Sequence, residues 1–260
     1  MSIKEQIEQK LKDIEKKEGV RILLAVESGS RAWGFDSPDS DYDVRFIYVH
    51  PREWYLSLKK GRDVIEELDP EGLLDVSGWD VMKALSLMSR GNCAIVEWLG
   101  SPVVYYKDEN FLRDVNAIKD LCFREVSAVN HYYHLAMNHD RRYLEKRGCE
   151  LKRFLYHIRG LLAAQWCVER GTYPPVPFME LVEAVVKDDH IMAELKELVK
   201  LKSESREHDQ TIVSDALIEY ATKTKQEIAR LLNSLPSGSA PDIEEFDSLL
   251  LREINKTHIV

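Results

Sequence analysis

The stretch Gly29-Ser-Arg-Ala-Trp-Gly-Phe-Asp-Ser-Pro-Asp-Ser-Asp-Tyr-Asp43 carries most of the information about the N-terminal part of the chain. It follows Arg21-Ile-Leu-Leu-Ala-Val-Glu27, an apolar run with the length of a strand buried on both faces. Glycine lets a backbone or an anion come close, and the N–H groups at the start of a helix attract anions. Gly29 and Ser30, at the end of this strand, are therefore candidates for binding a phosphate.

Two aspartates end the stretch. Asp41 and Asp43 begin a second predicted strand, residues 41–49, and side chains two apart on a strand leave the same face. Neighbouring carboxylates repel each other unless a cation lies between them, and Mg²⁺ typically takes one or two carboxylates together with substrate phosphates. The pattern predicts metal-assisted phosphoryl or nucleotidyl transfer. A bare Asp-x-Asp is more often a solvated pair near a turn, but its place behind the Gly-Ser strand end disfavours that interpretation here.

The composition is that of an ordinary globular protein, with 44% hydrophobic and 31% charged residues. A chain of 260 residues is comfortable for two domains, at the usual ~100–200 residues each. Its apolar runs fall short of the ~18–20 residues of a membrane-spanning helix. The charged N-terminus is not a secretory signal, and the four cysteines form no CxxC pair. We therefore expect a cytoplasmic protein with reduced thiols and no membrane partner.

The charge is unevenly distributed along the chain. The net charge of −9 argues against a protein that coats nucleic acid with its whole surface. Residues 131–160, however, contain seven basic and three acidic residues, which gives this window a net charge of +4. The window predicts a local basic face within an acidic protein.

The predicted elements change in character near residue 108. Short strands and helices precede it, and long helical segments follow it with no convincing strand between them. The expected elements are a helix at 3–17, strands at 21–27, 41–49, 63–68 and 73–76, a helix at 79–89 capped by Ser77, a helix at 94–99, and helical segments at 108–147, 149–170, 178–201 and 207–234. We expect an α/β domain at 1–107, a helical domain at 108–234, and a linker with a short helix at 235–260.

Several motifs, taken in order, resemble one group of proteins. Gly-Ser followed by Asp-x-Asp resembles the signature of the DNA polymerase β-type nucleotidyltransferase superfamily. The fuller resemblance, over roughly residues 20–180, is to the predicted nucleotidyltransferases associated with RNA repair, the YcgL/RlaP-like group. The motifs that carry it are GSRAWGFDSPDSDYDVRFIY, LDVSGWDVMKAL, NCAIVEWLGSPVVY, and LKRFLYHIRGLLAAQW followed by a Pro-Pro loop.

The resemblance implies both a fold and a reaction. The fold is an α/β (α+β) nucleotidyltransferase domain with a mixed sheet at 1–107, followed by an all-α domain at 108–234 that binds nucleotide or substrate. The reaction is the transfer of a nucleoside monophosphate from an NTP to a hydroxyl acceptor, with release of pyrophosphate and with Mg²⁺ or Mn²⁺ as the cofactor.

The resemblance also implies a third carboxylate on a neighbouring strand. Asp75 fits a mid-strand position, whereas Asp80 falls near the start of a helix, where the dipole favours an acid anyway. Asp41, Asp43 and Asp75 are therefore the expected metal ligands and catalytic residues, with Asp80 as the alternative to Asp75. The expected nucleotide-binding residues are Gly29, Ser30, Arg31, Ser40, Arg45, Lys152, Tyr156 and Arg159.

Some of these residues have a structural interpretation as well. Lys152, Tyr156 and Arg159 share one helix face, which on its own would indicate a solvated basic stripe. Arg45 is an equal candidate for a structural ion pair, and Trp33 favours packing over base stacking. The family motif at this helix is the reason to expect contacts with the triphosphate or the acceptor.

The acceptor stays open at this point. An RNA end (a tRNA or a broken RNA) is suggested by the family and by the basic window, while a small molecule or a protein hydroxyl are alternatives. A different class of function is an NTP-binding sensor or antitoxin-like module with little turnover. The sequence also leaves the preferred base and the oligomeric state open.

Overall fold

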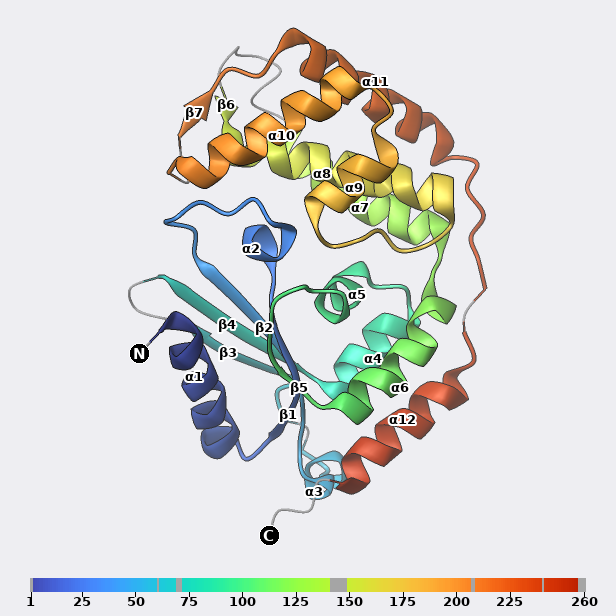
Figure 1. Ribbon diagram of the computed structural model, residues 1–260. Helices are drawn as coiled ribbons and strands as arrows, with labels where there is room; N and C mark the ends of the chain where they lie inside the picture. The colour runs from blue at the N-terminus through green and yellow to red at the C-terminus, as the bar shows by residue number, and fades with distance from the viewer. Residues whose placement is uncertain are drawn as a thin grey trace. The chain divides into compact units, whose positions relative to one another are not determined.

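The computed structural model describes residues 2–59, 61–68, 72–140, 149–206, 209–239 and 241–256, which form two compact units (Figure 1). Unit 1 comprises Met1–Gly29, Asp41–Cys122 and Ala240–Val260, and unit 2 comprises Ser30–Ser40 and Phe123–Ser239. The units divide the chain differently from the expected domains: the boundary expected at 107/108 falls inside unit 1, because the helix after it contacts the sheet.

Unit 1 is built on a five-stranded sheet in the order β3-β4-β2-β1-β5. The strands are β1 (Arg21–Glu27), β2 (Tyr42–Val49), β3 (Val64–Leu68), β4 (Leu74–Asp80) and β5 (Val104–Lys107). β2 and β4 are parallel and the other neighbouring pairs are antiparallel, so the sheet is mixed, as expected. The parallel register sets Asp43 opposite Asp75.

Helix α1 (Ile3–Glu18) covers one face of this sheet. Ser2 and Glu5 form a capping box at its start, and Gly19 ends it in the left-handed conformation. Its buried stripe packs on alternate residues of the strands, because side chains two apart on a strand share a face. The stripe and its partners on β2 are Ile7, Leu11 and Ile14, with Val44, Phe46 and Tyr48. Asp43 and Arg45 alternate with these residues and therefore belong to the other face.

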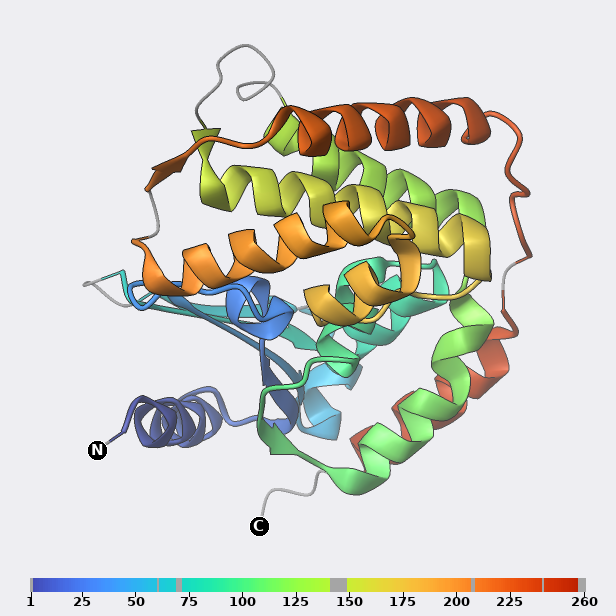
Figure 2. The ribbon, with the colours of Figure 1, turned by 45° about the horizontal axis from the view of Figure 1, so that its top comes forward.

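Figure 2 shows α4 and α5 on the side of the sheet away from α1. The remaining helices of unit 1 are α3 (Arg52–Leu56), α4 (Val81–Ser89), α5 (Cys93–Leu99), α6 (Glu109–Lys119), a 3₁₀ turn (Asp120–Cys122) and α12 (Ile243–Lys256). α12, from the end of the chain, packs against α4 and α6 (Figure 1). The sheet unit is therefore completed by residues that lie more than a hundred positions beyond it in sequence.

The sequence-based expectation for the end of β4 was wrong. The strand was expected to end at residue 76, with Ser77 as the cap of the next helix, but β4 continues to Asp80, whose Oδ1 accepts the N–H of Met82 at 2.9 Å and caps α4. Glycine occupies position 78 because a Cβ there would collide with the ring of Phe46 on the neighbouring strand. It allows close packing within the strand rather than a turn.

Unit 2 is helical and is centred on α8 (Leu151–Arg170), which contacts each of the other four long helices. Those helices are α7 (Glu125–Asp140), α9 (Phe178–Val185), α10 (Asp189–Glu204) and α11 (Asp215–Leu231). Two short strands, β6 (Cys149–Glu150) and β7 (Gln210–Thr211), pair with each other. The one-turn helix α2 (Gly29–Trp33) begins at Gly29, which belongs to unit 1, and its other residues belong to unit 2.

Two long helices expected from the sequence are divided in the structure. The segment expected at 108–147 is α6, the 3₁₀ turn and α7, and its last part, 141–147, lies outside the described residues. The segment expected at 178–201 breaks after Val185, because Asp188 caps α10 by accepting the N–H groups of His190 and Ile191. Among the helices described, none has the length and apolar character to cross a membrane.

Candidate active site

Two aspartates and one arginine meet on the sheet face of unit 1 opposite α1. Asp43 and Asp75 are register partners on the parallel strands β2 and β4. One nitrogen of Arg45, Nη2, lies 3.0 Å from Asp43 Oδ1 and 2.8 Å from Asp75 Oδ2. Its Nη1 donates to the backbone carbonyl of Asp75 at 3.1 Å. A guanidinium thus lies between Asp43 and Asp75 in this structure, and Arg45 forms ion pairs with both.

The backbone of Gly29 lies directly against Asp43. Gly29 has a φ of +61°, a conformation that favours glycine, and a Cβ added there would collide with Asp43 Oδ2. The N–H of Ser28 donates to the Asp43 carbonyl at 2.8 Å, which fixes the end of β1 beside the start of β2. The glycine is needed here both for its conformation and for the space that it leaves.

A buried glutamate that was not among the expected site residues holds Asp43 in place. Glu27 is 1% exposed, and its Oε1 accepts the backbone N–H of Asp43 at 2.7 Å. Tyr105 on β5 donates its hydroxyl to Glu27 Oε2, and Ser101 donates to the Glu27 carbonyl at 2.7 Å. The available signal was a charged residue that ends an otherwise apolar strand immediately before the Gly-Ser turn.

The two candidates for the third carboxylate have different surroundings. Asp75 is partly exposed and lies opposite Asp43. Asp80 is buried, caps α4 and accepts the hydroxyl of Tyr55 at 2.7 Å. Burial raises the pKa of Asp80 to about 6. Asp80 thus has a structural role at the far end of β4.

The carboxylates at this site are of the chemical type that divalent cations prefer, but Arg45 occupies the position between two of them. Asp41 directly precedes β2 and is half-buried, and Asp43 and Asp75 offer the carboxylate oxygens that hard divalent ions prefer. Within the described residues, no group of three or more His, Cys, Asp or Glu side chains is arranged to hold a metal ion. Arg45 neutralises Asp43 and Asp75, so a divalent ion would compete with its guanidinium for these oxygens.

A cavity of about 500 Å³ opens on the same face of the sheet. Its lining comes from β2, β3, β4 and α5, and comprises Arg45, Glu66, Asp75, Ser77, Trp79 and Trp98. The rings of Trp79 and Trp98 lie 4.2 Å apart between centroids, at an angle of 40°. Asp75 therefore borders a space that is large enough for a small molecule or for one end of a larger one.

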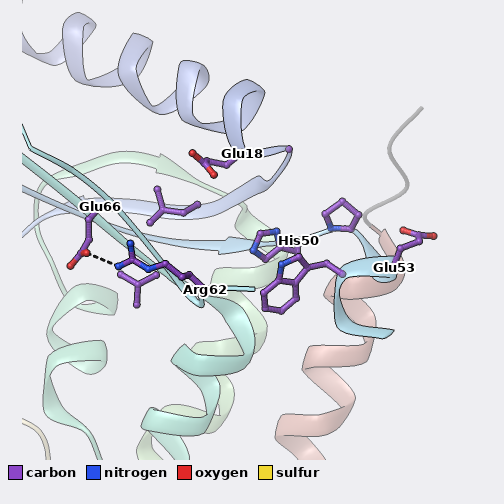
Figure 3. A pocket seen from close by; sticks show the side chains of 10 residues that line it. Glu18, His50, Glu53, Arg62 and Glu66 are labelled. Carbon is purple, nitrogen blue, oxygen red and sulfur yellow. Dashed lines mark hydrogen bonds and ion pairs between the residues drawn. The ribbon is translucent and has the colours of Figure 1, made fainter. Parts of the chain in front are cut away.

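A second cavity in unit 1, of about 640 Å³, has different chemistry (Figure 3). His50 stacks on Trp54 at 4.1 Å, and burial lowers the pKa of His50. Arg62 pairs with Glu66 at 2.9 Å, as Figure 3 shows. The described residues that line this cavity do not include Asp41, Asp43 or Asp75. It is not the space beside the paired aspartates.

The expected nucleotide-binding residues of the 30–40 segment belong to unit 2 and are held by contacts within it. The Ser30 carbonyl accepts the N–H of Gly34 at 3.0 Å. Arg31 pairs with Asp36 at 3.0 Å and donates to the Ser40 carbonyl at 2.5 Å. The hydroxyls of Ser37 and Ser40 lie 2.9 Å apart. The ammonium group of the buried Lys202 donates to the Ser37 hydroxyl, also at 2.9 Å. These contacts brace the segment as a compact loop.

The expected residues of α8 pack against that same loop. The Arg159 guanidinium is buried 4.0 Å over the ring of Trp33. Tyr156 makes an edge contact with Trp33 at 4.8 Å between centroids, and Lys152 lies 5.6 Å from the Tyr156 ring. Trp33 thus packs within the unit, and contact of these residues with a nucleotide stays a prediction. Four residues of the basic window lie outside the described residues: Arg141, Arg142, Lys146 and Arg147.

Comparisons with known proteins agree with the motifs. Residues 3–252 match the model of RlaP, the RNA repair pathway DNA polymerase beta family. A relative from Bacillus subtilis (strain 168), named uncharacterized protein YcgL, is 37% identical over 254 residues, which span 98% of this chain and 97% of the relative. A solved nucleotidyltransferase-like protein from Exiguobacterium sibiricum 255-15 is 14% identical, with 96% of this chain and 80% of that chain covered. Its TM-score is 0.31.

The family match and the mixed sheet indicate a nucleotidyltransferase of the polymerase β type. The chain belongs to the RNA repair pathway DNA polymerase beta family. The resemblance found in the sequence motifs is thereby confirmed.

Proposed function

We propose that this protein transfers a nucleoside monophosphate from an NTP to a hydroxyl acceptor and releases pyrophosphate. The observation that carries the proposal is the pairing of Asp43 with Asp75 across parallel strands, with the Gly29 backbone against Asp43. Family membership supports the same reaction class.

In the proposed reaction, Asp75 accepts the proton of the acceptor hydroxyl. The hydroxyl oxygen then forms a bond to the α-phosphorus while the bond from that phosphorus to the bridging oxygen breaks, and pyrophosphate leaves with the electron pair. Asp41, Asp43 and Asp75 would hold Mg²⁺ or Mn²⁺, which when bound supplies charge neutralisation at the reacting phosphate. Positioning and charge neutralisation supply most of the rate in such reactions.

Arg45 has two roles in this proposal. In the structure it compensates the charges of Asp43 and Asp75, and its guanidinium then competes with a divalent cation for the same oxygens. If a divalent cation displaces the guanidinium from these oxygens, Arg45 remains beside the aspartates. There it is suited to neutralise phosphate charge. Ser30, Arg31, Ser40, Lys152, Tyr156 and Arg159 stay proposed contacts of the triphosphate.

The experiment is incubation of the full chain with each α-labelled NTP, Mg²⁺ and a mixture of RNA and protein acceptors. Pyrophosphate release together with a labelled product supports the proposal, and the label's carrier identifies the acceptor class. The family's description supports RNA among the acceptors to be included. Tight NTP binding without pyrophosphate release would instead identify a sensor. The ion pairs of Arg45 with Asp43 and Asp75 are compatible with that function too, because they already compensate the two carboxylates.

A further inference from the structure

The side chains of β4 that line the cavity beside Asp75 change in chemical type along the strand. Asp75, Ser77 and Trp79 are every second residue of the strand and therefore share one of its faces. All three line the cavity. Trp79 lies four residue steps beyond Asp75 along the strand, which is about 13 Å at ~3.3 Å per step. The cavity thus presents a carboxylate at one end, a hydroxyl in the middle and an aromatic surface at the other end.

The aromatic end is built from two tryptophans. Trp98 on α5 is 6% exposed and packs on Trp79, which is half-buried on β4. The contact with Trp98 restrains the ring of Trp79, and both tryptophans line the cavity. Nucleobases stack on aromatic surfaces irrespective of their sequence, since every base has a π-face.

The charged lining disfavours a phosphate in the cavity. Glu66 on the edge strand β3 is the register partner of Ser77, so a second carboxylate faces the same space. The positive charge of Arg45 is already shared between Asp43 and Asp75. Glu66 is paired in the same way with Arg62 at 2.9 Å. A phosphate placed between Glu66 and Asp75 would therefore compete with these carboxylates for arginines that they already bind.

We propose that this cavity binds the acceptor, and that the acceptor end is an uncharged nucleoside unit. Its base stacks on Trp79 and Trp98, its ribose lies over Ser77, and a ribose hydroxyl reaches Asp75. The assignment of the hydroxyl to Asp75 rests on the proposed function, whereas binding of a nucleoside does not. The donor in the resulting reaction is the NTP, with pyrophosphate as the leaving group as described above.

Equilibrium binding of adenosine to the full chain, measured by calorimetry, tests the proposal. Trp79→Leu should weaken adenosine binding about ten- to hundredfold, from the value of a base stack. Trp54→Leu, which alters the tryptophan of the other cavity, is the matched control and should bind as the wild type does. Adenosine 3′-monophosphate should bind more weakly than adenosine, and Glu66→Gln should reduce that difference.

Equal adenosine binding by the wild type and a folded Trp79→Leu protein would overturn the proposal. So would Trp79-dependent binding of a hydroxylated amino sugar in place of adenosine. If the leucine variant fails to fold, Trp79→Phe keeps a ring and should retain part of the affinity, while adenosine titration of the wild type should shift tryptophan indole NMR signals. An unshifted indole spectrum counts against the site.

The two proposals can fail separately. Asp43-dependent pyrophosphate release without any adenosine binding would contradict the nucleoside site and leave nucleotidyl transfer intact. Trp79-dependent adenosine binding by a protein that turns over no NTP would contradict nucleotidyl transfer and leave the site intact.

Discussion

At the scale of single residues, the site is organised around the charge balance of Asp43, Asp75 and Arg45. Each carboxylate is within 3.0 Å of the same guanidinium nitrogen. The carboxylates are partly exposed, so their ion pairs are screened by solvent and contribute modestly to stability. The arrangement keeps two like charges side by side until a stronger cation competes for them.

Replacing Arg45 tests two separate effects, its contribution to stability and its competition with Mg²⁺ for the carboxylates. Without divalent ions, Arg45→Gln should destabilise the protein by about 1 kcal/mol, because two carboxylates lose their partner. Mg²⁺ should bind the variant more tightly than it binds the wild type, since the competing guanidinium is gone, while nucleotidyl transfer falls. Calorimetric titration with Mg²⁺ alone is the measurement, and unchanged or weaker Mg²⁺ binding would count against competition at these oxygens.

Gly29 can be tested against a glycine with almost the same backbone. Gly29→Ala and Gly19→Ala both place alanine at a φ near +60°, of +61° and +62°. A Cβ at position 29 collides with Asp43, whereas one at position 19 meets no described atom within 4 Å.

Gly19→Ala should cost about 1 kcal/mol in unfolding free energy from backbone strain alone. Gly29→Ala should cost more and should abolish transfer, because Asp43 has to move. Urea denaturation gives both values. Equal costs, with activity retained in Gly29→Ala, would show that Asp43 does not depend on this contact.

At the scale of elements, the N-terminus of α4 contains a buried acid with a pKa of about 6, raised chiefly by burial. The folded-state pKa lies above the ordinary value of 3.8. The folded state therefore binds more protons than the unfolded state between these pH values, and the stability contributed by Asp80 falls as the pH rises through this window.

Asp80→Asn keeps the cap but removes the titration. The stability of the wild type relative to this variant should fall by about 2–3 kcal/mol between pH 4 and pH 7, from a shift of roughly two pKa units. Unfolding free energies measured at four pH values test this. Parallel pH profiles for the two proteins would mean that Asp80 titrates normally.

Local patterns in the sequence predict much of the fold. α1, β1 and β2 follow from hydrophobic periodicity, and the mixed sheet followed by helices agrees with the expected class. β4 was expected too short, with Ser77 as a helix cap, because the packing of Gly78 against Phe46 involves another strand. β5 (Val104–Lys107) and α3 (Arg52–Leu56) were not predicted, since short elements carry little periodicity.

The same limit applies to the candidate site. Asp41 and Asp43 are visible as a motif, and Asp75 follows from the family resemblance. Glu27 and Tyr105 interact across 78 positions of sequence, and Arg45 bridges to Asp75 across 30. No spacing rule within one element reports such contacts, because strand order and register determine them. The cavity lined by Trp79 and Trp98 was unpredictable for the same reason.

At the scale of the whole molecule, neither unit is a continuous piece of chain. The segment Ser30–Ser40 belongs to unit 2, although it lies in sequence between strands of unit 1. Ala240–Val260 returns to unit 1, where Glu253 is buried and pairs with Arg21 at 2.8 Å. The chain therefore crosses between the units at four peptide bonds, and a cut at one of them does not yield a complete sheet unit.

α12 tests how much this returning segment stabilises unit 1. Leu249 is fully buried and Leu251, on the same helix, is 58% exposed. Leu249→Ala should cost about 2–4 kcal/mol in unfolding free energy through lost burial and a cavity. Leu251→Ala should change it by no more than about 0.5 kcal/mol. Chemical denaturation of both variants is the check, and similar small losses would mean that α12 adds little to the unit.

The central claim is that Asp43 and Asp75 act together in nucleotidyl transfer. The most direct measurement is pyrophosphate release from NTP, with Mg²⁺ and the acceptor identified by labelling, in Asp43→Asn, Asp75→Asn and the control Asp80→Asn. The first two should lose at least roughly 10²–10³-fold in rate while remaining folded, and the control should retain activity. Folded Asp43→Asn and Asp75→Asn proteins with wild-type rates would contradict the claim.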